Sequence, residues 1–402
     1  MLAIGAASTA AMAAAQGGLP ALGPALQHAF GLTLVQVTGV FTAFGAGTVL
    51  TVYAWGALVD RVGERVVLAV GPALGGFALA TVVLFDSYGA LLAGVFAAGL
   101  FAAAATGGSG RAVFGWFPRS ERGFALGLRQ TSVQLGTAAG SFTLPTLAAW
   151  FSLDVALVAL AGGLVVSSLI AGIWLRDPPL RKSAAPPGPP AARDPRIWRL
   201  GVASALLIVG QIGVTSLLVL YLYTERDWSA TAAAFALGTV QLGGAAARVI
   251  AGRWSDLHDE RIAPFRRLAA GAGAFLLAAT ALADAPDAVL VPLLMCGGVL
   301  AMSWNGLSFT AAAEISGGAQ AGRAMGMQNT LMRAMGAVVP VGLGTLAAHG
   351  SWRVTFLVMG VAPLAGRALL GPLVVDEDER RRERLARLSA RSSPSPSAAQ
   401  TR

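Results

Sequence analysis

Apolar runs close to 20 residues long recur along the sequence, for example VVLAVGPALGGFALATVVLF at 66–85 and a second run at 154–175. A helix of this length crosses the ~30 Å hydrocarbon core of a bilayer, because each helical residue adds about 1.5 Å. Charged residues make up 12% of the 402-residue chain, whereas soluble domains carry about 25%. We therefore predict an all-α membrane protein that crosses the bilayer many times.

Twelve transmembrane helices are expected, with the first retained in the protein and not removed as a signal sequence. Their predicted ranges are 3–26, 33–57, 66–85, 88–113, 125–149, 154–175, 197–223, 229–252, 266–284, 288–314, 324–348 and 352–374. The stretch RDPPLRKSAAPPGPPAARDPR lies between the sixth and seventh spans, and its proline and charge content predicts a cytoplasmic linker. The expected domains are an N-terminal six-helix bundle (1–175), this linker (176–196), a C-terminal six-helix bundle (197–375) and a tail (376–402) that forms a short helix followed by disorder.

The charges of the loops alternate along the chain. Loops after the even-numbered spans are rich in arginine, whereas the intervening loops carry acidic residues and only Arg226 and Arg353 as basic ones. Because positively charged loops stay in the cytoplasm, this pattern predicts a plasma-membrane protein with both termini on the cytoplasmic side. The net charge of +9 does not indicate nucleic-acid binding, since the basic residues lie between spans and not along one face.

Three pairs of segments repeat at nearly the same offset. GALVDRVGER (56–65) aligns with GRWSDLHDER (252–261), which is 196 residues later. RGFALGLRQT (122–131) aligns with AGRAMGMQNT (321–330) at an offset of 199, and Gln16 aligns with Gln211 at 195. The repetition predicts two parallel six-helix pseudo-repeats around a central cavity, with a binding site near the middle of the membrane.

GALVDRVGER resembles the loop signature of the major facilitator superfamily, and GRWSDLHDER resembles its weaker second copy. The resemblance implies the twelve-helix fold and secondary transport by alternating access. We expect the two glycines of these copies to permit close helix contact, and the two aspartates to latch the cytoplasmic side by meeting a helix N-terminus or an arginine. The expected gating residues are Gly56, Asp60, Arg61, Gly63, Arg65, Gly252, Asp256 and Arg261.

Polar residues inside the apolar spans are the candidates for substrate binding, because a charge within the membrane is costly and faces a bundle interior or water. Gln130 and Gln134, like Asn329 and Arg333, are spaced i, i+4 and give each helix one polar face. We expect the central cavity to be lined by Arg129, Gln130, Gln134, Asn329, Arg333, Arg248, Gln16, Gln211, Asn305 and Trp304.

Arginine supplies a rigid fork of donors that suits a carboxylate or another planar oxyanion. No acidic residue lies deep in any predicted span, so the cavity is expected to be positive and the substrate to be a small organic anion. AARVIAG (246–252) is similar to the eighth-helix stretch of monocarboxylate transporters and oxalate:formate exchangers, where the arginine before the glycine binds carboxylate. The segment around 122–131 also resembles transporters of the cyanate type.

Other functions stay open at this point. A proton-coupled efflux pump for amphiphilic compounds is the main alternative. Such exporters carry an arginine in the fourth span and a Gly-Pro pair in the fifth, whereas 94–101 lacks the arginine and 136–145 lacks the Gly-Pro pair. Other solutes, or a transporter-like sensor without flux, are further alternatives. No enzyme, cofactor or metal site is expected, since His28, His258 and His349 lie far apart and no phosphate loop is present. The expected partners are a small anion and the lipid bilayer, a co-transported ion is left open, and the protein is expected to be a monomer.

Overall fold

The computed structural model describes residues 2–105, 122–176, 193–316 and 320–392. In the N-terminal half of the chain the helices are α1 (Leu2–Ala21), α2 (Gly23–Phe30), α3 (Leu34–Val62), α4 (Glu64–Ala80), the 3₁₀ helix η1 (Thr81–Leu84), α5 (Tyr88–Ala102), α7 (Arg122–Trp150) and α8 (Leu153–Trp174). The predicted linker and the second part of the fourth predicted span lie outside the described residues.

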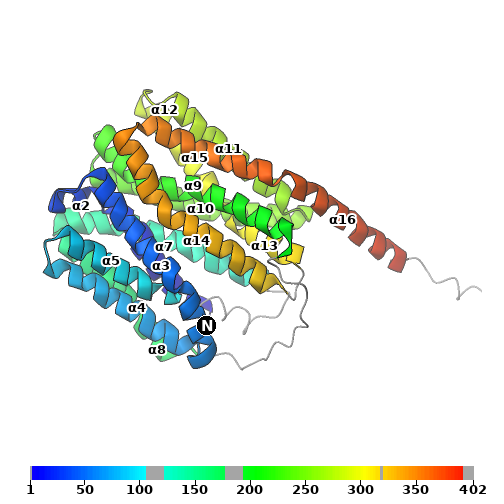
Figure 1. Ribbon diagram of the computed structural model, residues 1–402, viewed down its shortest axis with the longest axis horizontal. Coiled ribbons are helices and arrows are strands. Elements are labelled where there is room, and N and C mark those ends of the chain that lie inside the picture. The colour runs from blue at the N-terminus through cyan, green and yellow to red at the C-terminus, as the bar shows by residue number, and fades with distance from the viewer. Residues whose placement is uncertain (1, 106–121, 177–192, 317–319, 393–402) are drawn as a thin grey trace, which may run out of the picture.

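The C-terminal half consists of α9 (Pro195–Glu225), α10 (Ala230–His258), α11 (Ile262–Ala281), α12 (Asp287–Ala301), α13 (Asn305–Ser316), α14 (Ala321–His349), α15 (Trp352–Leu369) and α16 (Gly371–Ser392). The two halves lie side by side with their helices running in the same general direction (Figure 1). Within the described ranges, nine helical stretches are long and apolar enough to cross a membrane, and α5 is a shorter apolar helix. The all-helical prediction is confirmed, whereas the count of twelve helices and the repeat stay predictions.

Side-chain caps set the starts of several long helices at one end of the bundle. Thr33 and Gln36 form a capping box at the start of α3, and Ser87, Ser152 and Ser229 each accept a backbone N–H at the starts of α5, α8 and α10. Such caps satisfy amide groups that have no partner within the helix. We call this end of the bundle the capped end. The other end, where α3 meets α4 and α10 meets α11, carries the two copies of the loop signature, and we call it the motif end.

Close approach between helix backbones holds each half together. A Cβ on Gly99 of α5 would lie 2.2 Å from the carbonyl oxygen of Phe44 on α3, and one on Gly136 of α7 would lie 2.1 Å from that of Ala10 on α1. Only glycine fits at these two positions. Small residues at helix contacts are the usual way to gain van der Waals packing inside a membrane, where no hydrophobic drive pushes helices together.

The two halves touch along α3 with α14 and along α7 with α10. Near the capped end, a Cβ on Gly344 would overlap the side chain of Thr38, and one on Gly45 would lie 3.2 Å from Cα of Ala337. Gly56 follows Thr38 by 18 residues, which is five turns, so it lies on the same face of α3. A Cβ on Gly56 would nevertheless meet no atom of the described residues within 4 Å, so α3 and α14 diverge toward the motif end.

The contact between α7 and α10 is defined nearer the capped end. Gly238 of α10 lies against the ring of Phe142 on α7, whereas Gly252, four turns further along α10, meets no described atom within 4 Å. The side chains of 122–129, at the start of α7, lie outside the described part of the chain. The expectation that Gly56 and Gly252 permit close helix contact therefore stays a prediction. The contacts that the structure describes between α3 and α14 lie near the capped end and in the middle, whereas Gly56 lies at the motif end.

Several predicted spans are divided in the structure. The first is broken at Leu22, just before Pro24, which cannot donate a backbone hydrogen bond. The tenth is broken over 302–304, between α12 and α13. The twelfth ends at Leu369, and its last residues belong to α16.

The tail prediction requires a correction as well. Helix α16 starts at Gly371 and has 22 residues, so it is longer and begins earlier than the short helix expected after Asp376. The reason is that its first turn is part of the core: Leu370 and Leu373 are fully buried in a cluster with Ile262 and Phe265 of α11. Residues 393–402, where disorder was expected, lie outside the described part of the chain.

Candidate functional site

Arg248 is the most buried charge among the candidate residues that the structure describes in full. It lies ten residues, or about 15 Å, before the end of α10. Its side chain is only 7% exposed. A buried charge inside an apolar bundle needs compensating partners, because moving it from water into the membrane costs at least ~2.5–3.5 kcal/mol.

Four oxygen acceptors surround the guanidinium of Arg248. Nη1 donates to the backbone carbonyl of Gln130 at 2.8 Å and to Oε1 of Gln134 at 2.7 Å, both on α7. Nη2 donates to the backbone carbonyl of Met302 at 2.5 Å and to Oδ1 of Asn305 at 2.7 Å. Nε is buried without a hydrogen-bond partner. None of these four partners is acidic, so among the described residues neutral dipoles stabilise the cation, at about 1.5–3 kcal/mol for each charged hydrogen bond.

The break between α12 and α13 makes part of this arrangement possible. The backbone carbonyl of Met302, at the end of α12, accepts from Arg248 and also from Nε2 of Gln134 at 3.3 Å. Ser303 donates back to the carbonyl of Val299 at 2.5 Å, which closes the last turn of α12. The partial negative charge of a helix C-terminus favours a cation, so the end of α12 adds to the compensation of Arg248.

Three predicted site residues therefore meet Arg248, namely Gln130, Gln134 and Asn305. Gln134 and Asn305 contribute their side chains and are 1% and 8% exposed, while Gln130 contributes its backbone. Sequence reasoning missed Met302, because an apolar residue in an apolar run carries no signal that its carbonyl will be released from the helix.

The other predicted residues occupy separate places. Gln16 on α1, Gln211 on α9 and Asn329 on α14 are half-buried, and Oε1 of Gln211 is buried without a hydrogen-bond partner. Arg333 on α14 is half-buried and takes part in an interaction of its own. The side chain of Arg129 lies outside the described part of the chain.

Trp304 belongs to the core of the C-terminal half. It is fully buried, and its ring stacks on that of Phe265 with 5.2 Å between centroids and 8° between planes. Trp304, which was expected to line the central cavity, thus packs between the helix break and α11.

A buried polar cluster that sequence reasoning missed joins three helices of the C-terminal half. Gln328 of α14 donates to Ser204 of α9 at 2.9 Å and to Ser308 of α13, and the two serine hydroxyls are 2.7 Å apart. All three residues are fully buried. The repeat could have indicated this cluster, since Gln328 aligns with Arg129 of the other half.

The second copy of the loop signature forms an ion-pair cluster at the motif end. Arg261 lies 2.6 Å from Asp256 and 3.1 Å from Glu314 of α13, and it also donates to Ser255. Arginine is one of the two partners expected for Asp256. The cluster links the end of α10 to α13 within the C-terminal half.

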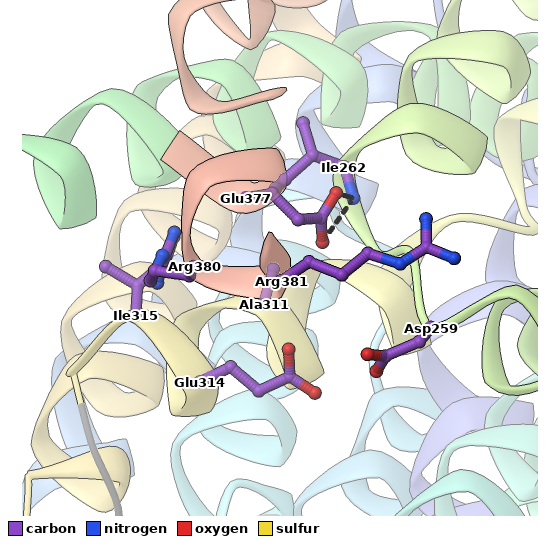
Figure 2. A pocket seen from close by; sticks show the side chains of 8 residues that line it. All are labelled: Asp259, Ile262, Ala311, Glu314, Ile315, Glu377, Arg380 and Arg381. Carbon is purple, nitrogen blue, oxygen red and sulfur yellow. Dashed lines mark hydrogen bonds between the residues drawn. The ribbon is translucent and has the colours of Figure 1, made fainter. Parts of the chain in front are cut away.

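Helix α16 is bound to the same place. The carboxylate of Glu377 accepts from the backbone N–H of Arg261 at 2.6 Å and from that of Ile262 at 3.0 Å, at the start of α11. Figure 2 shows Glu377 directed at Ile262, with Arg381 beside it. Glu377, Arg381 and Glu314 are among the residues that line a small cavity of about 50 Å³. Arg381 adds an ion pair to Glu260 at 3.2 Å.

The first copy connects α3 to α4 through a glycine. Gly63 has φ of +89°, which other residues rarely adopt, and its position between the two helices lets the chain reverse there. Nε of Arg65 donates to the carbonyl of Gly172 on α8 at 2.7 Å, and Arg61 is exposed. The side chain of Asp60 lies outside the described part of the chain.

Comparison with known proteins identifies the family. The model of the Major Facilitator Superfamily matches residues 4–340. The chain belongs to this superfamily. It is a multi-pass membrane transporter and not an enzyme, as the sequence predicted.

Two mycobacterial proteins and one solved structure illustrate the similarity. An uncharacterised MFS-type transporter of Mycobacterium tuberculosis is 35% identical over 360 residues, which cover 88% of this chain and 80% of the relative. A probable nitrate/nitrite transporter of the same species is 31% identical over 268 residues, or 61% of this chain and 64% of that one. The crystal structure of a bacterial homologue of the human lysosomal transporter Spinster, inward-facing and occupied, aligns with a TM-score of 0.73 at 13% identity, covering 92% of this chain and 95% of that one.

Proposed function

We propose that this superfamily member is a secondary transporter for a small anionic solute with a planar oxyanion group, such as a carboxylate or nitrate. The observation that carries the proposal is Arg248, a buried cation in the middle of α10 whose four partners are all neutral. A carboxylate within the protein would have cancelled its charge. With amide and carbonyl dipoles only, the site keeps a net positive charge that an anion from solution can balance.

Two further points support an anionic substrate. Arg333 places a second cation on α14, twelve residues from the motif end of that helix, or about 18 Å. The probable nitrate/nitrite transporter among the relatives is named for two planar oxyanions. Arginine presents its donors in a fork that matches such groups, which a lysine ammonium does not.

We also propose how the protein lies in the membrane and how it works. The arginine-rich loops put the motif end on the cytoplasmic side. In this orientation the ends of α3 and α14 near Gly56 separate toward the cytoplasm, and the contacts of Gly344 and Gly45 close the other side. Alternating access then requires these two sets of contacts to exchange.

Flux into proteoliposomes tests the proposal. Purified full-length protein is reconstituted, and uptake of nitrate and of oxalate is measured with and without a proton gradient. The proposal expects saturable uptake of at least one anion, with a loss of tenfold or more in Arg248→Gln and in Arg333→Gln at equal amounts of inserted protein. Export of ethidium that is unaffected by these two substitutions, without any anion uptake, would support an amphiphile exporter and refute the proposal.

A further inference from the structure

Three helices of the C-terminal half meet on the capped side of Arg248. A Cβ on Gly298 of α12 would lie 2.8 Å from a methyl group of Val240 on α10 and 2.9 Å from one of Val214 on α9, and this contact marks a level along the bundle. From it, Arg248 lies eight residues along α10 toward the motif end, or about 12 Å, and Met302 lies four residues along α12 in the same direction, or about 6 Å. The carbonyl of Met302 accepts from Nη2 of Arg248, so the arginine side chain extends back toward the capped end.

Gln211 of α9 lies at nearly the same depth as the partner of that guanidinium. Gln211 precedes Val214 by three residues, and α9 runs from the motif end to the capped end, so Gln211 lies about 4.5 Å from the marked level toward the motif end. Met302 and Gln211 are therefore within about 2 Å of the same depth. Because side chains lean toward the N-terminus of their own helix, the side chains of Gln211 and Arg248 lean toward each other along the bundle.

The orientation of α9 also directs Gln211 at α10. Gln211 and Thr215 are spaced i, i+4 and share one face of α9. Thr215 accepts a hydrogen bond from Nε2 of Gln241 on α10 at 3.3 Å. Arg248 follows Gln241 by seven residues, or two turns, and so lies on the same face of α10. The faces that carry Gln211 and Arg248 are therefore turned toward each other.

Gln211 offers an acceptor that the protein does not use. Its Oε1 is buried, and no group of the described residues donates to it. Between 207 and 222, partial exposure is confined to Gln211, Ile212 and Thr215, so part of this polar face stays accessible. A buried amide oxygen without a donor is costly, so its donor has to be water or a ligand. Nε–H of Arg248 is an unused donor in the same sense, since no described residue accepts from it.

An unused donor and an unused acceptor suit different parts of one ligand. A carboxylate supplies only acceptors, which suit the cationic guanidinium. It cannot serve Oε1 of Gln211, which needs an O–H or N–H group. A hydroxyl group on the carbon next to the carboxylate supplies that donor. The pair therefore fits a 2-hydroxycarboxylate better than it fits nitrate, acetate or oxalate.

We propose that Oε1 of Gln211 accepts a hydrogen bond from the hydroxyl group of a hydroxycarboxylate substrate, whose carboxylate is attracted by the charge of Arg248. This inference rests on the proposed anion transport and deepens it, because it names the class of substrate. Gln211 is then a residue that determines specificity. It contributes to the binding of hydroxycarboxylates and not to that of anions without a hydroxyl group.

Isothermal titration of the purified full chain with potassium glycolate and potassium acetate tests the inference, because these anions differ by one hydroxyl group. Potassium chloride is the control for ionic strength. The unaltered protein should bind glycolate about five- to tenfold more tightly than acetate, the change that one neutral hydrogen bond produces. Gln211→Leu should bind both anions as the unaltered protein binds acetate. Thr224→Val is the matched control and should keep the preference, since Thr224 is exposed on α9 and donates to the carbonyl of Leu220 in its own turn.

A preference for glycolate that disappears in Gln211→Leu and remains in Thr224→Val supports the inference. Three results overturn it and leave anion transport intact: equal binding of the two anions by the unaltered protein, a preference retained in Gln211→Leu, or an equal loss of both anions in that variant. If Gln211→Leu does not insert into membranes, Gln211→Met has a similar length and takes its place. Absence of binding of glycolate, acetate, nitrate and oxalate by the unaltered protein overturns the proposed function and this inference together.

Discussion

Replacing Glu377 by glutamine should loosen α16 from the motif end. The carboxylate accepts from two backbone amide groups at the start of α11, that of Arg261 at 2.6 Å and that of Ile262 at 3.0 Å. A charged hydrogen bond contributes about 1.5–3 kcal/mol and a neutral one about 1 kcal/mol, so losing the charge costs about 1 kcal/mol for each amide. The favourable position of an anion at a helix N-terminus adds about 0.3–1 kcal/mol. The total of about 2–3 kcal/mol corresponds to at least ~30-fold in the ratio of undocked to docked α16.

Hydrogen–deuterium exchange in lipid nanodiscs measures this change. The amide of Ile262 should exchange at least tenfold faster in Glu377→Gln than in the unaltered protein, whereas peptides from α1 and α7 should be unaffected. Glu379→Gln is the control, since Glu379 is exposed on the same helix. The ion pair of Arg381 with Glu260 remains, so α16 should stay helical. Exchange at Ile262 within a factor of two of the unaltered protein would show that Glu377 does not hold the helix in place.

Three further outcomes are expected. Arg248→Lys should reduce anion flux at least tenfold with normal membrane insertion, because a single ammonium cannot reach acceptors in both halves. Flux near the rate of the unaltered protein would show that transport does not need the forked donors of arginine. Gly344→Ala should push α14 away from α3 and increase labelling of the site from outside in cysteine-accessibility assays. Gly56→Ala should have no effect on the conformation seen here. Equal effects of the two substitutions would contradict the divergence of α3 and α14. In a cysteine-free background, a cysteine at Asp154 should be labelled only from outside and one at Ser183 only from the cytoplasm, and the reverse would invert the proposed orientation.

Sequence reasoning identified the main features of the fold because they depend on composition and spacing. Apolar runs of a fixed length predict helices, and the GALVDRVGER signature indicates the family. The depth of Arg248, and the polar neighbours Gln134 and Asn305, follow from their positions along long helices. These features require no knowledge of how the helices pack.

The arrangement around Arg248 could not be predicted in the same way. The break over 302–304 contains neither glycine nor proline, and its freed carbonyl is stabilised by donors from α10 and α7. Trp304 illustrates a related difficulty, because an aromatic residue among polar ones suits a cavity wall and a helix contact equally well. Gly56 illustrates a third difficulty, because a small residue permits a helix contact but does not indicate in which conformation that contact forms.

The change in spacing along α3 and α14 also has a mechanical consequence. Gly45, where the two backbones are in close contact, follows the start of α3 by 11 residues and precedes its end by 17, or about 16 Å and 26 Å of helix. If α3 tilts as a rigid rod about this contact, its two ends move in the ratio of these lever arms. Each ångström of movement at Leu34 then becomes about 1.5 Å at Val62. A slight rearrangement of methyl groups at the short arm is thereby magnified into the larger travel needed at the long arm.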